Sequence, residues 1–418
     1  MDKLTHADCF GAVTAYLSQW QSFWRDSVFY DLCVPWRKEF PALSVALLAL
    51  SDADFRVLDQ SPRRLSEFLA AYIPEYDELV NLVNALAPYD RAADVTGRDT
   101  TCQDTRAQKL ASQARLAAGV PGRKWQQIQA YMTALGEPIR EHLRVVDWCS
   151  GKSHLGRAVA WSVGASLHFI ERNPELCAAG LKSAQTCLGD LCVATFDCAD
   201  VLTDPVHFQA DDAVVALHAC GDLHRTLLQR WLQSPSGYLA LAPCCYHQWL
   251  KDIYVPQSTL ARSHDLCFTR NQIRVAVQEM VTSPERVRRQ ADELKVYRLA
   301  FDLLQRDVRG VNAYLPTPSL PGSAVNLGVD AVVRLLAEKK GLSLPDKLDM
   351  EAYLQRARER YRQVQRLNLA TQGFRRAIEC WLVLDLVLAL EEQGARVQLQ
   401  QFCDRQLTPR NLLITATR

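Results

Sequence analysis

Residues 143–156 read Leu143-Arg-Val-Val-Asp147-Trp-Cys-Ser-Gly151-Lys-Ser-His-Leu-Gly156. An apolar segment that ends at an acid, followed by a turn with glycine and the start of a helix, is a pattern that binds nucleoside-bearing ligands. Glycine lets backbone amides approach a ligand closely, and the first turn of a helix presents N–H groups. The stretch therefore predicts a strand, a binding turn and a helix that begins near His154.

Short apolar segments continue to alternate with helical ones after this stretch, which indicates an α/β fold with a parallel, doubly wound sheet. The predicted strands are 143–148, 167–170, 192–196, 213–217, 238–242, 396–400 and 412–415. The predicted intervening helices are 174–187, 223–232 and 374–393.

The remaining segments have helical apolar spacing and little strand character. We predict a helical N-terminal domain over 1–105, a ligand-binding core over 120–255, a helical insertion over 256–370, and a last helix with two closing strands over 371–418. The polar stretch 92–108 is interpreted as a linker, and a helix is predicted over 123–135.

The composition is that of a globular protein, with 418 residues and a net charge of +1. No apolar run reaches 18 residues, because Asp385 interrupts 381–390, so no membrane partner is expected. The start, Met1-Asp2-Lys3, has no apolar leader segment, so we expect a cytoplasmic protein. None of the 14 cysteines falls in a Cys-x-x-Cys pair, so reduced thiols and no metal site are expected.

Charge is distributed unevenly along the chain. Residues 1–100 contain 9 basic and 15 acidic residues, a net of −6, and residues 101–418 contain the other 39 and 32, a net of +7. Basic residues are densest over 356–376. A solvated helix explains this density, whereas a phosphate-contacting surface gains weight only if a nucleic-acid enzyme is indicated independently.

Acids close three successive predicted strands, at Asp147, Glu171 and Asp200. A carboxylate at the second strand end can accept hydrogen bonds from both ribose hydroxyls. Asp200 can accept the exocyclic amine of an adenine with the Val201 amide as its partner, and Asp197 is the alternative acid. An acid within the first turn would repel a pyrophosphate but suits the cationic amino acid portion of S-adenosylmethionine (SAM). SAM is therefore the predicted cofactor, with helix capping as the alternative role for these acids.

The fourth and fifth predicted strands lead into Leu217-His-Ala-Cys-Gly-Asp-Leu223 and Pro243-Cys-Cys-Tyr-His247. Both lie at carboxyl ends of strands, where ligands bind in open α/β sheets. Either His218 or His247 can act as a general base. The adjacent thiols of Cys244 and Cys245 are a nucleophile or a metal ligand only as a minor alternative. The predicted catalytic residues are His218, Asp222, Cys244, Cys245, Tyr246 and His247.

At these residues the chain resembles the SAM-dependent methyltransferase domain family with an HACGD and a CCYH segment. This group includes proteins described as methyltransferase-like or as carrying a glutathione S-transferase C-terminal domain, and it is similar, more distantly, to tRNA 2′-O-methyltransferases. The resemblance covers residue 120 to the C-terminus, the insertion excepted. The matching strings are Gly122–Gln127, Asp147–Gly156, Leu217–Leu223, Pro243–His247 and Thr408–Leu412.

The resemblance implies a Rossmann-like, seven-stranded methyltransferase sheet. In the family's first motif, Asp-x-Gly-x-Gly-x-Gly, Cys149 and Ser153 replace two glycines here. The segment 243–246 stands where amino-group methyltransferases have Asn-Pro-Pro-Tyr and lacks its amide. N-methylation by that mechanism is therefore not supported, and a hydroxyl acceptor fits no worse, as the resemblance to tRNA methyltransferases suggests. The predicted cofactor-binding residues are Asp147, Cys149, Gly151, Gly156, Glu171, Asp200 and Val201.

Three functions are compatible with these features. The first is a SAM-dependent methyltransferase that acts on tRNA or rRNA, as the basic residues after 100 favour. The second is a methyltransferase for a protein or small molecule, which the pI of about 7.5 favours. The third is a non-catalytic binding module that retains the fold, to which the two replaced glycines point.

Overall fold

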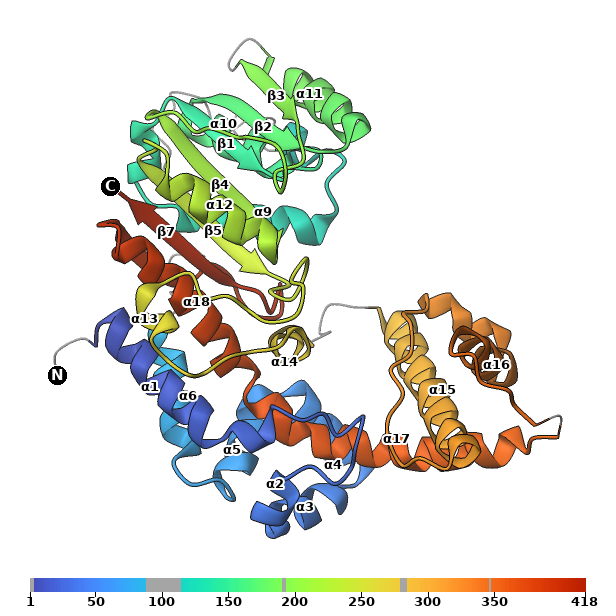
Figure 1. Ribbon diagram of the computed structural model, residues 1–418. Coiled ribbons are helices and arrows are strands. Elements are labelled where there is room, and N and C mark those ends of the chain that lie inside the picture. Colours follow the sequence, from blue (N-terminus) through green and yellow to red (C-terminus); the bar gives the residue numbers. More distant parts are fainter. Residues whose placement is uncertain (1–3, 88–113, 190–192, 279–283, 346) are drawn as a thin grey trace. The chain divides into compact units, whose positions relative to one another are not determined.

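The computed structural model describes residues 4–87, 114–189, 193–278, 284–345 and 347–418 (Figure 1). The chain divides into two compact units. The sheet unit comprises residues 1–18, 79–279 and 376–418, and the helical unit comprises 19–78 and 280–375. The predicted division differs from this one, because residues 19–78 pack with the insertion rather than forming a separate domain. The predicted linker over 92–108 lies outside the described residues.

The sheet unit contains one seven-stranded sheet with the order β3-β2-β1-β4-β5-β7-β6. The first five strands pair in parallel, whereas β7 lies antiparallel between β5 and β6. The strands are β1 (Arg144–Trp148), β2 (Ser166–Glu171), β3 (Ala194–Cys198), β4 (Asp212–Cys220), β5 (Tyr238–Cys244), β6 (Arg396–Gln401) and β7 (Leu412–Thr417).

This topology confirms the predicted Rossmann-like fold and refines it to a mixed sheet. The strand order reverses between β1 and β4, and a crevice forms at the carboxyl ends of strands on either side of such a switch point. The turns that follow β1, β2, β4 and β5 therefore all lie at the carboxyl ends of the parallel strands.

Local sequence explains where the helices around the sheet begin and end. α10 (His154–Val163) ends at Gly164, which adopts the left-handed conformation at φ 72°. α11 (Pro174–Leu188) starts with proline, and the Asn173 side chain accepts hydrogen bonds from the Glu175 and Leu176 amides. The other helices of this unit are α1 (His6–Gln19), α9 (Gly122–Ala134), α12 (Asp222–Leu232), α13 (Thr259–Arg262), α14 (Arg270–Ile273) and α18 (Arg375–Glu391), with α6 (Tyr76–Leu86) at the boundary and short 3₁₀ turns at Pro138–Glu141 and Arg274–Val277.

The helices cover both faces of the sheet. One core joins apolar residues of α9, α10 and α11 to one face, and within it the Tyr131 hydroxyl donates to the Ala240 carbonyl (2.6 Å). α12 lies on the other face, where the Trp148 indole N–H donates to the Leu223 carbonyl (3.0 Å). Because both faces are buried, the central strands consist almost entirely of apolar residues.

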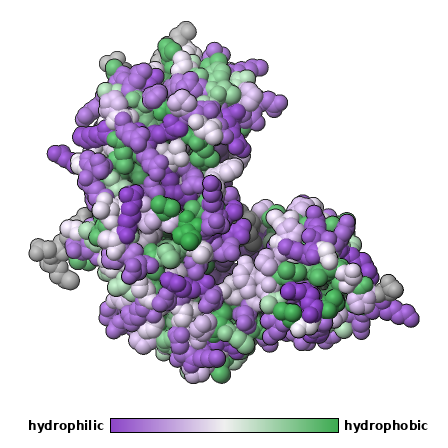
Figure 2. Space-filling model, viewed as in Figure 1, coloured by the Kyte–Doolittle hydropathy of each residue, from purple (hydrophilic) through white to green (hydrophobic). Residues whose placement is uncertain are grey.

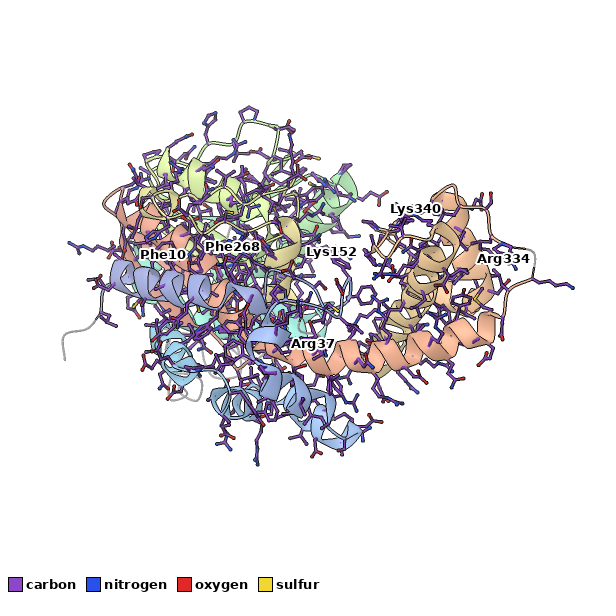
Figure 3. All side chains as sticks on the ribbon, turned by 60° about the horizontal axis from the view of Figure 1, so that its bottom comes forward. Phe10, Arg37, Lys152, Phe268, Arg334 and Lys340 are labelled. Atoms are coloured by element: carbon purple, nitrogen blue, oxygen red, sulfur yellow. The ribbon has the colours of Figure 1, made fainter. Side chains whose placement is uncertain are left out.

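α18 packs on α1 through aromatic rings. Phe10 and Phe268 both pack against Trp381 with tilted rings, their centroids 5.3 and 4.9 Å from it, and lie close together in Figure 3. Asp385, which interrupts the apolar run of α18, is fully buried. Its carboxylate accepts hydrogen bonds from the Tyr254 hydroxyl (2.7 Å) and the Ser258 amide (2.8 Å), so it anchors the segment after β5.

The helical unit has a core of its own. The helices of this unit are α2 (Trp36–Glu39), α3 (Pro41–Leu48), α4 (Asp52–Gln60), α5 (Pro62–Ala70), α15 (Glu285–Arg309), α16 (Val329–Lys339) and α17 (Met350–Gly373), with 3₁₀ turns at Gln21–Phe23 and Gly322–Leu327. The core is formed by α15, α16 and α17. α17 also packs on α3, α4 and α5.

The arginines of α17 pair with acids within the helical unit. Arg360 contacts the buried Asp302 (2.9 Å), and Arg366 contacts Asp52 (2.6 Å). Arg356 and Arg358 form ion pairs with acids of α15 at 3.3 Å each. These pairs favour a structural role for the basic segment over a phosphate-contacting surface.

The face of the molecule in Figure 2 is mostly hydrophilic, with small apolar patches. Among the described helices, none combines the length and the apolar composition that a bilayer crossing requires.

Candidate active site

The turn after β1 keeps the backbone shape of a glycine-rich loop although glycine occupies one of three positions. Cys149, Gly151 and Ser153 adopt positive φ values of 53°, 60° and 48°. A non-glycine residue in this region costs about 1 kcal/mol or more. The two replaced glycines therefore leave the path of the turn intact and store strain in it.

Asp147 lies beneath this turn and is only 2% exposed. Its Oδ2 accepts hydrogen bonds from the Ser153 hydroxyl (3.0 Å) and the Gly156 amide (2.9 Å). Burial raises the pKa of this carboxyl to about 6, against these two hydrogen bonds that lower it. The structure thus shows Asp147 fixing the start of α10, the capping role that was the alternative, and its contact with a cofactor stays a prediction.

Gly156 allows α10 to approach β1. A Cβ added at this position would lie 2.7 Å from the Asp147 Cβ and 2.7 Å from the Leu167 Cδ1. Gly156 is thus required for packing, and its predicted role in cofactor binding stays a prediction.

All three predicted acids influence the pKa of one side chain, the Cys149 thiol. Burial raises the pKa of this thiol to about 12, and the charges of Glu171, Asp147 and Asp200 raise it further. The Glu171 carboxylate also accepts the Gly151 amide at Oε2 (3.0 Å), which joins the end of β2 to the turn after β1. A carboxylate has about four acceptor positions, so Glu171 keeps acceptor capacity for ribose hydroxyls.

Asp200 begins a tight turn after β3 and forms an ion pair with Arg172 (3.7 Å). The guanidinium of Arg172 also lies over the ring of Trp249, 5.6 Å from its centroid. Val201, the predicted amide partner, has a buried side chain. The alternative acid, Asp197, is paired instead with His168 (3.2 Å).

His218 is positioned by an irregularity in β4. The register between β4 and β5 shifts at Leu217/Ala219, and His218 has φ 65°. Such bulges redirect a side chain, and here Nε2 lies 2.9 Å from the Gln127 Oε1. Burial lowers the pKa of His218 to about 4, so the imidazole is neutral and can accept a proton at pH 7.

Asp222 has a partner that defines its role. Its Oδ1 accepts the Arg225 Nε (2.7 Å), and the buried Arg225 also donates to the Tyr246 carbonyl (3.2 Å). The Asp222 amide donates to the Gln248 carbonyl (3.2 Å). These contacts tie α12 to the segment after β5, which makes Asp222 a positioning residue for that segment.

Tyr246 and His247 differ in placement. The Tyr246 hydroxyl is buried and donates to the Glu379 Oε1 (3.1 Å), so this side chain belongs to the core. A direct catalytic role for Tyr246 is therefore not supported by its placement. His247 is half-buried, and burial lowers its pKa, as does the nearby charge of Arg274.

Cys220, Cys244 and Cys245 form one cluster, with their sulfur atoms within 4.8 Å of one another. Hydrogen bonds from the other two thiols lower the pKa of Cys245. The sequence placed Cys220 at the same crevice as Cys244 and Cys245. The pairing of β4 with β5 brings its thiol next to that of Cys244, although the two residues are 24 positions apart.

Gln127 and Arg410 were not predicted as site residues, although both lie in sequence segments that resemble the methyltransferase family. Gln127 on α9 contacts His218, and its amide also donates to the Leu407 carbonyl (3.1 Å). Arg410 lies near Cys245 and lowers its pKa. Gln127 is 91 residues from His218, so no local signal joins them.

Part of the chain matches a known protein family, and several solved structures are similar to it. Residues 123–252, 130 of the 418, match the model of a family described as a methyltransferase domain. Similar solved structures include magnesium protoporphyrin IX methyltransferase from Synechocystis PCC 6803 with bound SAH (14% identity, 32% of this chain and 66% of that chain, TM-score 0.24). Another is geranyl diphosphate C-methyltransferase from Streptomyces coelicolor A3(2), also with S-adenosyl-L-homocysteine (15% identity, 43% of this chain and 64% of that chain, TM-score 0.24).

A third is coclaurine N-methyltransferase bound to N-methylheliamine and SAH (11% identity, 80% of this chain and 93% of that chain, TM-score 0.26). The chain spans slightly less than two thirds of the length of the first two proteins. TM-scores this low carry no argument about function. The family match does bear on it: residues 123–252 match a methyltransferase domain, which agrees with the enzyme class predicted from the sequence.

Proposed function

We propose that this chain transfers the methyl group of SAM to a hydroxyl group of RNA, in tRNA or rRNA. The observation that carries the proposal is the positive charge around the two histidines on the acceptor side of the crevice. Burial is the largest cause of the lowered pKa values of His218 and His247, and nearby cations lower these pKa values further. These cations come from separate segments and are Lys124, Arg270, Arg274 and Arg410.

Positive charge that converges from several segments suits a polyanionic acceptor better than a neutral metabolite. An exposed aromatic residue follows His247 by two positions: Trp249 is 48% exposed and has φ 61°. Rings of this kind stack on unpaired bases, and each such stack contributes about 1–3 kcal/mol. Trp249 and Arg172 together are the expected base-binding surface.

The residues of the first three strand ends suit the nucleoside portion of SAM. Glu171 retains acceptor capacity, and Cys149, Gly151 and Ser153 of the turn after β1 have small side chains or none. SAM, when bound, supplies an electrophilic methyl group for in-line displacement. His218 then accepts the proton that the acceptor hydroxyl loses, while Gln127 holds the imidazole in place. A base with a pKa of about 4 is weak, so proton removal accompanies rather than precedes methyl transfer.

The HACGD and CCYH strings support a finer placement, near the methyltransferase-like group and the tRNA 2′-O-methyltransferases. In this chain, they supply His218, the cysteine cluster and the Asp222–Arg225 pair. This placement and the cytoplasmic location remain part of the proposal.

The test uses the full chain with radiolabelled SAM and three acceptor pools: unmodified tRNA and rRNA, a peptide library, and a metabolite extract. We expect label in RNA alone. Transfer to peptides or metabolites with none to RNA would refute the RNA acceptor and leave the enzyme class intact. A chain that binds SAM but methylates none of the pools would favour the non-catalytic module.

Salt-dependent binding to tRNA supplies an independent measurement. Arg274→Ala should lower the slope of log affinity against log salt by about one, because one phosphate contact is lost. Arg140→Ala is the matched control, since Arg140 comes just before β1, at the amino ends of the parallel strands and opposite the crevice. Equal slopes in both variants would contradict the proposed surface.

A further inference from the structure

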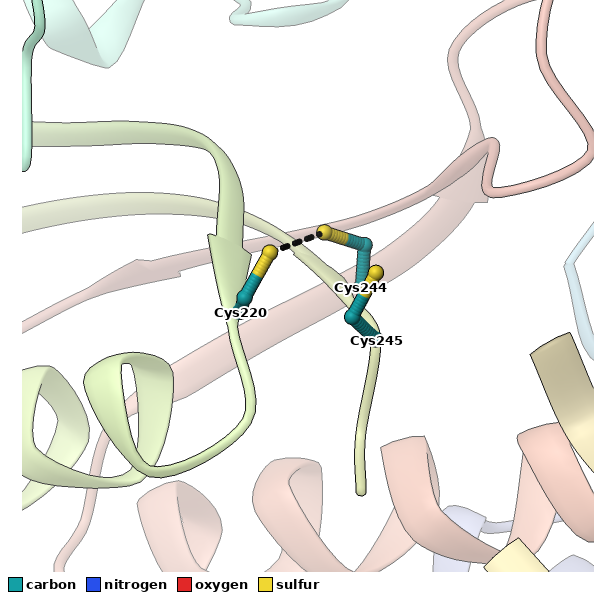
Figure 4. Close-up of side chains that lie close together, drawn as sticks. All are labelled: Cys220, Cys244 and Cys245. Carbon is teal, nitrogen blue, oxygen red and sulfur yellow. Dashed lines mark hydrogen bonds between the residues drawn. The ribbon is translucent and has the colours of Figure 1, made fainter. Parts of the chain in front are cut away.

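Three thiols meet where β4 and β5 end (Figure 4). The Sγ atoms of Cys220 and Cys244 are 3.3 Å apart, and all three sulfurs, with that of Cys245, lie within 4.8 Å of one another. Cys220 and Cys244 are register partners at the last paired position of the two strands. Of the described residues, only these form a group with the ligand geometry of a metal site.

The backbone holds the third thiol in this group at a cost. Cys245 has φ 44°, the left-handed region that non-glycine residues rarely adopt. About 1 kcal/mol or more is spent on this conformation, and the surrounding structure has to compensate for it. A strained residue that completes a cluster of reactive side chains indicates that the cluster itself has a function.

Close backbone contact fixes the two loops relative to each other. A Cβ added at Gly221 would lie 1.9 Å from the Gln248 carbonyl oxygen, so only glycine fits there. The Gly221 amide donates to the Cys244 carbonyl (3.1 Å), which places one hydrogen bond directly beside the thiols. The three sulfurs are therefore held by a rigid frame.

We propose that Cys220, Cys244 and Cys245 bind one Zn²⁺ ion. Zinc takes thiolates at about 2.3 Å in a tetrahedral arrangement, which sets neighbouring sulfurs about 3.8 Å apart. One sulfur separation is 3.3 Å and the other two are at most 4.8 Å, so shifts of about 1 Å or less bring the three sulfurs to the spacing that zinc requires.

Three protein ligands leave the fourth position of a tetrahedron open. No fourth histidine, cysteine or carboxylate among the described residues joins the group. An open position is the mark of a zinc site that binds water or a substrate rather than a purely structural one. His247, two residues after Cys245, has a buried Nδ1 without a hydrogen-bond partner among the described residues and is the nearest alternative occupant.

The chemistry of loading balances without a redox step. At each protonated cysteine the S–H bond breaks, the sulfur electron pair forms the bond to zinc, and the proton passes to the buffer. Up to three protons are released per ion, and no electron changes hands. The cysteines are then ligands, which replaces the nucleophilic role considered for Cys244 and Cys245.

The experiment measures metal in the full chain, kept reduced with a phosphine and titrated with Zn²⁺ against a competing chelator. We expect one ion per chain and a release of protons, which calorimetry detects as a heat of binding that changes with the ionisation enthalpy of the buffer. Replacement by Co²⁺ should produce the near-ultraviolet sulfur-to-metal charge-transfer absorption of thiolate ligands. His247→Ala should leave affinity within about threefold, whereas a loss of tenfold or more assigns the fourth ligand to His247 within the same zinc site.

Cys245→Ser should weaken zinc binding at least tenfold, and its fold is checked by its SAM binding. Cys267→Ser is the matched control, because Cys267 is an exposed cysteine of the same unit, and it should retain full binding. The proposal is overturned if the reduced chain takes up no zinc, or if both variants bind equally. A Cys220–Cys244 disulfide in a chain that takes no zinc after reduction also overturns it. None of these three outcomes bears on the RNA acceptor, which the transfer assay tests separately.

Discussion

Substitution of Gly156 by alanine tests whether α10 must approach β1 as closely as the structure shows. The added Cβ would meet Asp147 Cβ, Leu167 Cδ1 and Ser153 Oγ, each at 2.7 Å, whereas ordinary contacts begin near 3.4 Å. These atoms belong to two strands and the turn between β1 and α10, so they cannot all move aside. α10 must shift, and the hydrogen bond from the Gly156 amide to Asp147 weakens.

The expected cost follows from three contributions. Overpacking costs about 1–3 kcal/mol. Loss of a hydrogen bond to a charged acceptor costs about 1.5–3 kcal/mol. Alanine in place of glycine within a helix recovers about 1 kcal/mol. We therefore expect Gly156→Ala to lower the free energy of unfolding by about 1.5–5 kcal/mol.

Urea denaturation followed by circular dichroism measures this change, and calorimetric titration measures SAM affinity, which should fall at least tenfold as the turn moves. Gly11→Ala is the matched control. Gly11 lies within α1, and a Cβ there meets nothing within 4 Å, so this variant should gain about 0.5–1 kcal/mol. A Gly156→Ala chain within 0.5 kcal/mol of the wild type, on the order of measurement error, with unchanged SAM affinity, would refute the reasoning.

Three further predictions concern the same crevice. The folded-state pKa of Asp147 is raised from 3.8 to about 6, so its stabilising contribution is complete below pH 3.8 and is lost as pH rises through 6. Asp147→Asn should therefore remove about 3 kcal/mol from the pH dependence of the free energy of unfolding across that window. Unfolding measured at pH 4 and at pH 7 tests this. His218→Ala should lower kcat about 10²-fold or more at unchanged SAM affinity, and the wild-type rate should fall only near pH 4; an acidic limb near pH 6.5 would contradict the lowered pKa. Cys149→Val should destabilise by about 2 kcal/mol, because a β-branched residue resists φ 53°, while Cys149→Gly should stay within about 1 kcal/mol; equal stabilities would argue against strain in the turn.

The strands could be predicted from sequence because a sheet buried on both faces requires apolar runs. The limits of β1 and β5 agree within two residues with those expected. β4 continues to Cys220, beyond the predicted end at 217, because polar residues follow the apolar run and a bulge carries the strand through them. The antiparallel direction of β7 was missed, since an apolar run has no signal for direction.

The candidate site was predictable only where residues lie close in sequence. The turn after β1 and the acids at strand ends follow from a strand–turn–helix pattern. The contact between Gln127 and His218 and the approach of Cys220 to Cys244 depend on tertiary packing. The ion pairs of Arg360 and Arg366 likewise require acids from distant helices, which explains why charge density alone left two interpretations open.

The insertion of β7 between β5 and β6 has a consequence for synthesis on the ribosome. β5 ends at Cys244 and β7 begins at Leu412, so 167 residues separate them (412 − 244 − 1). At translation rates of about 5–20 residues per second, the outer edge of β5 stays unpaired for roughly 8–33 seconds. An exposed strand edge invites pairing with other chains, so nascent forms of this protein should depend on chaperones until the final strand emerges.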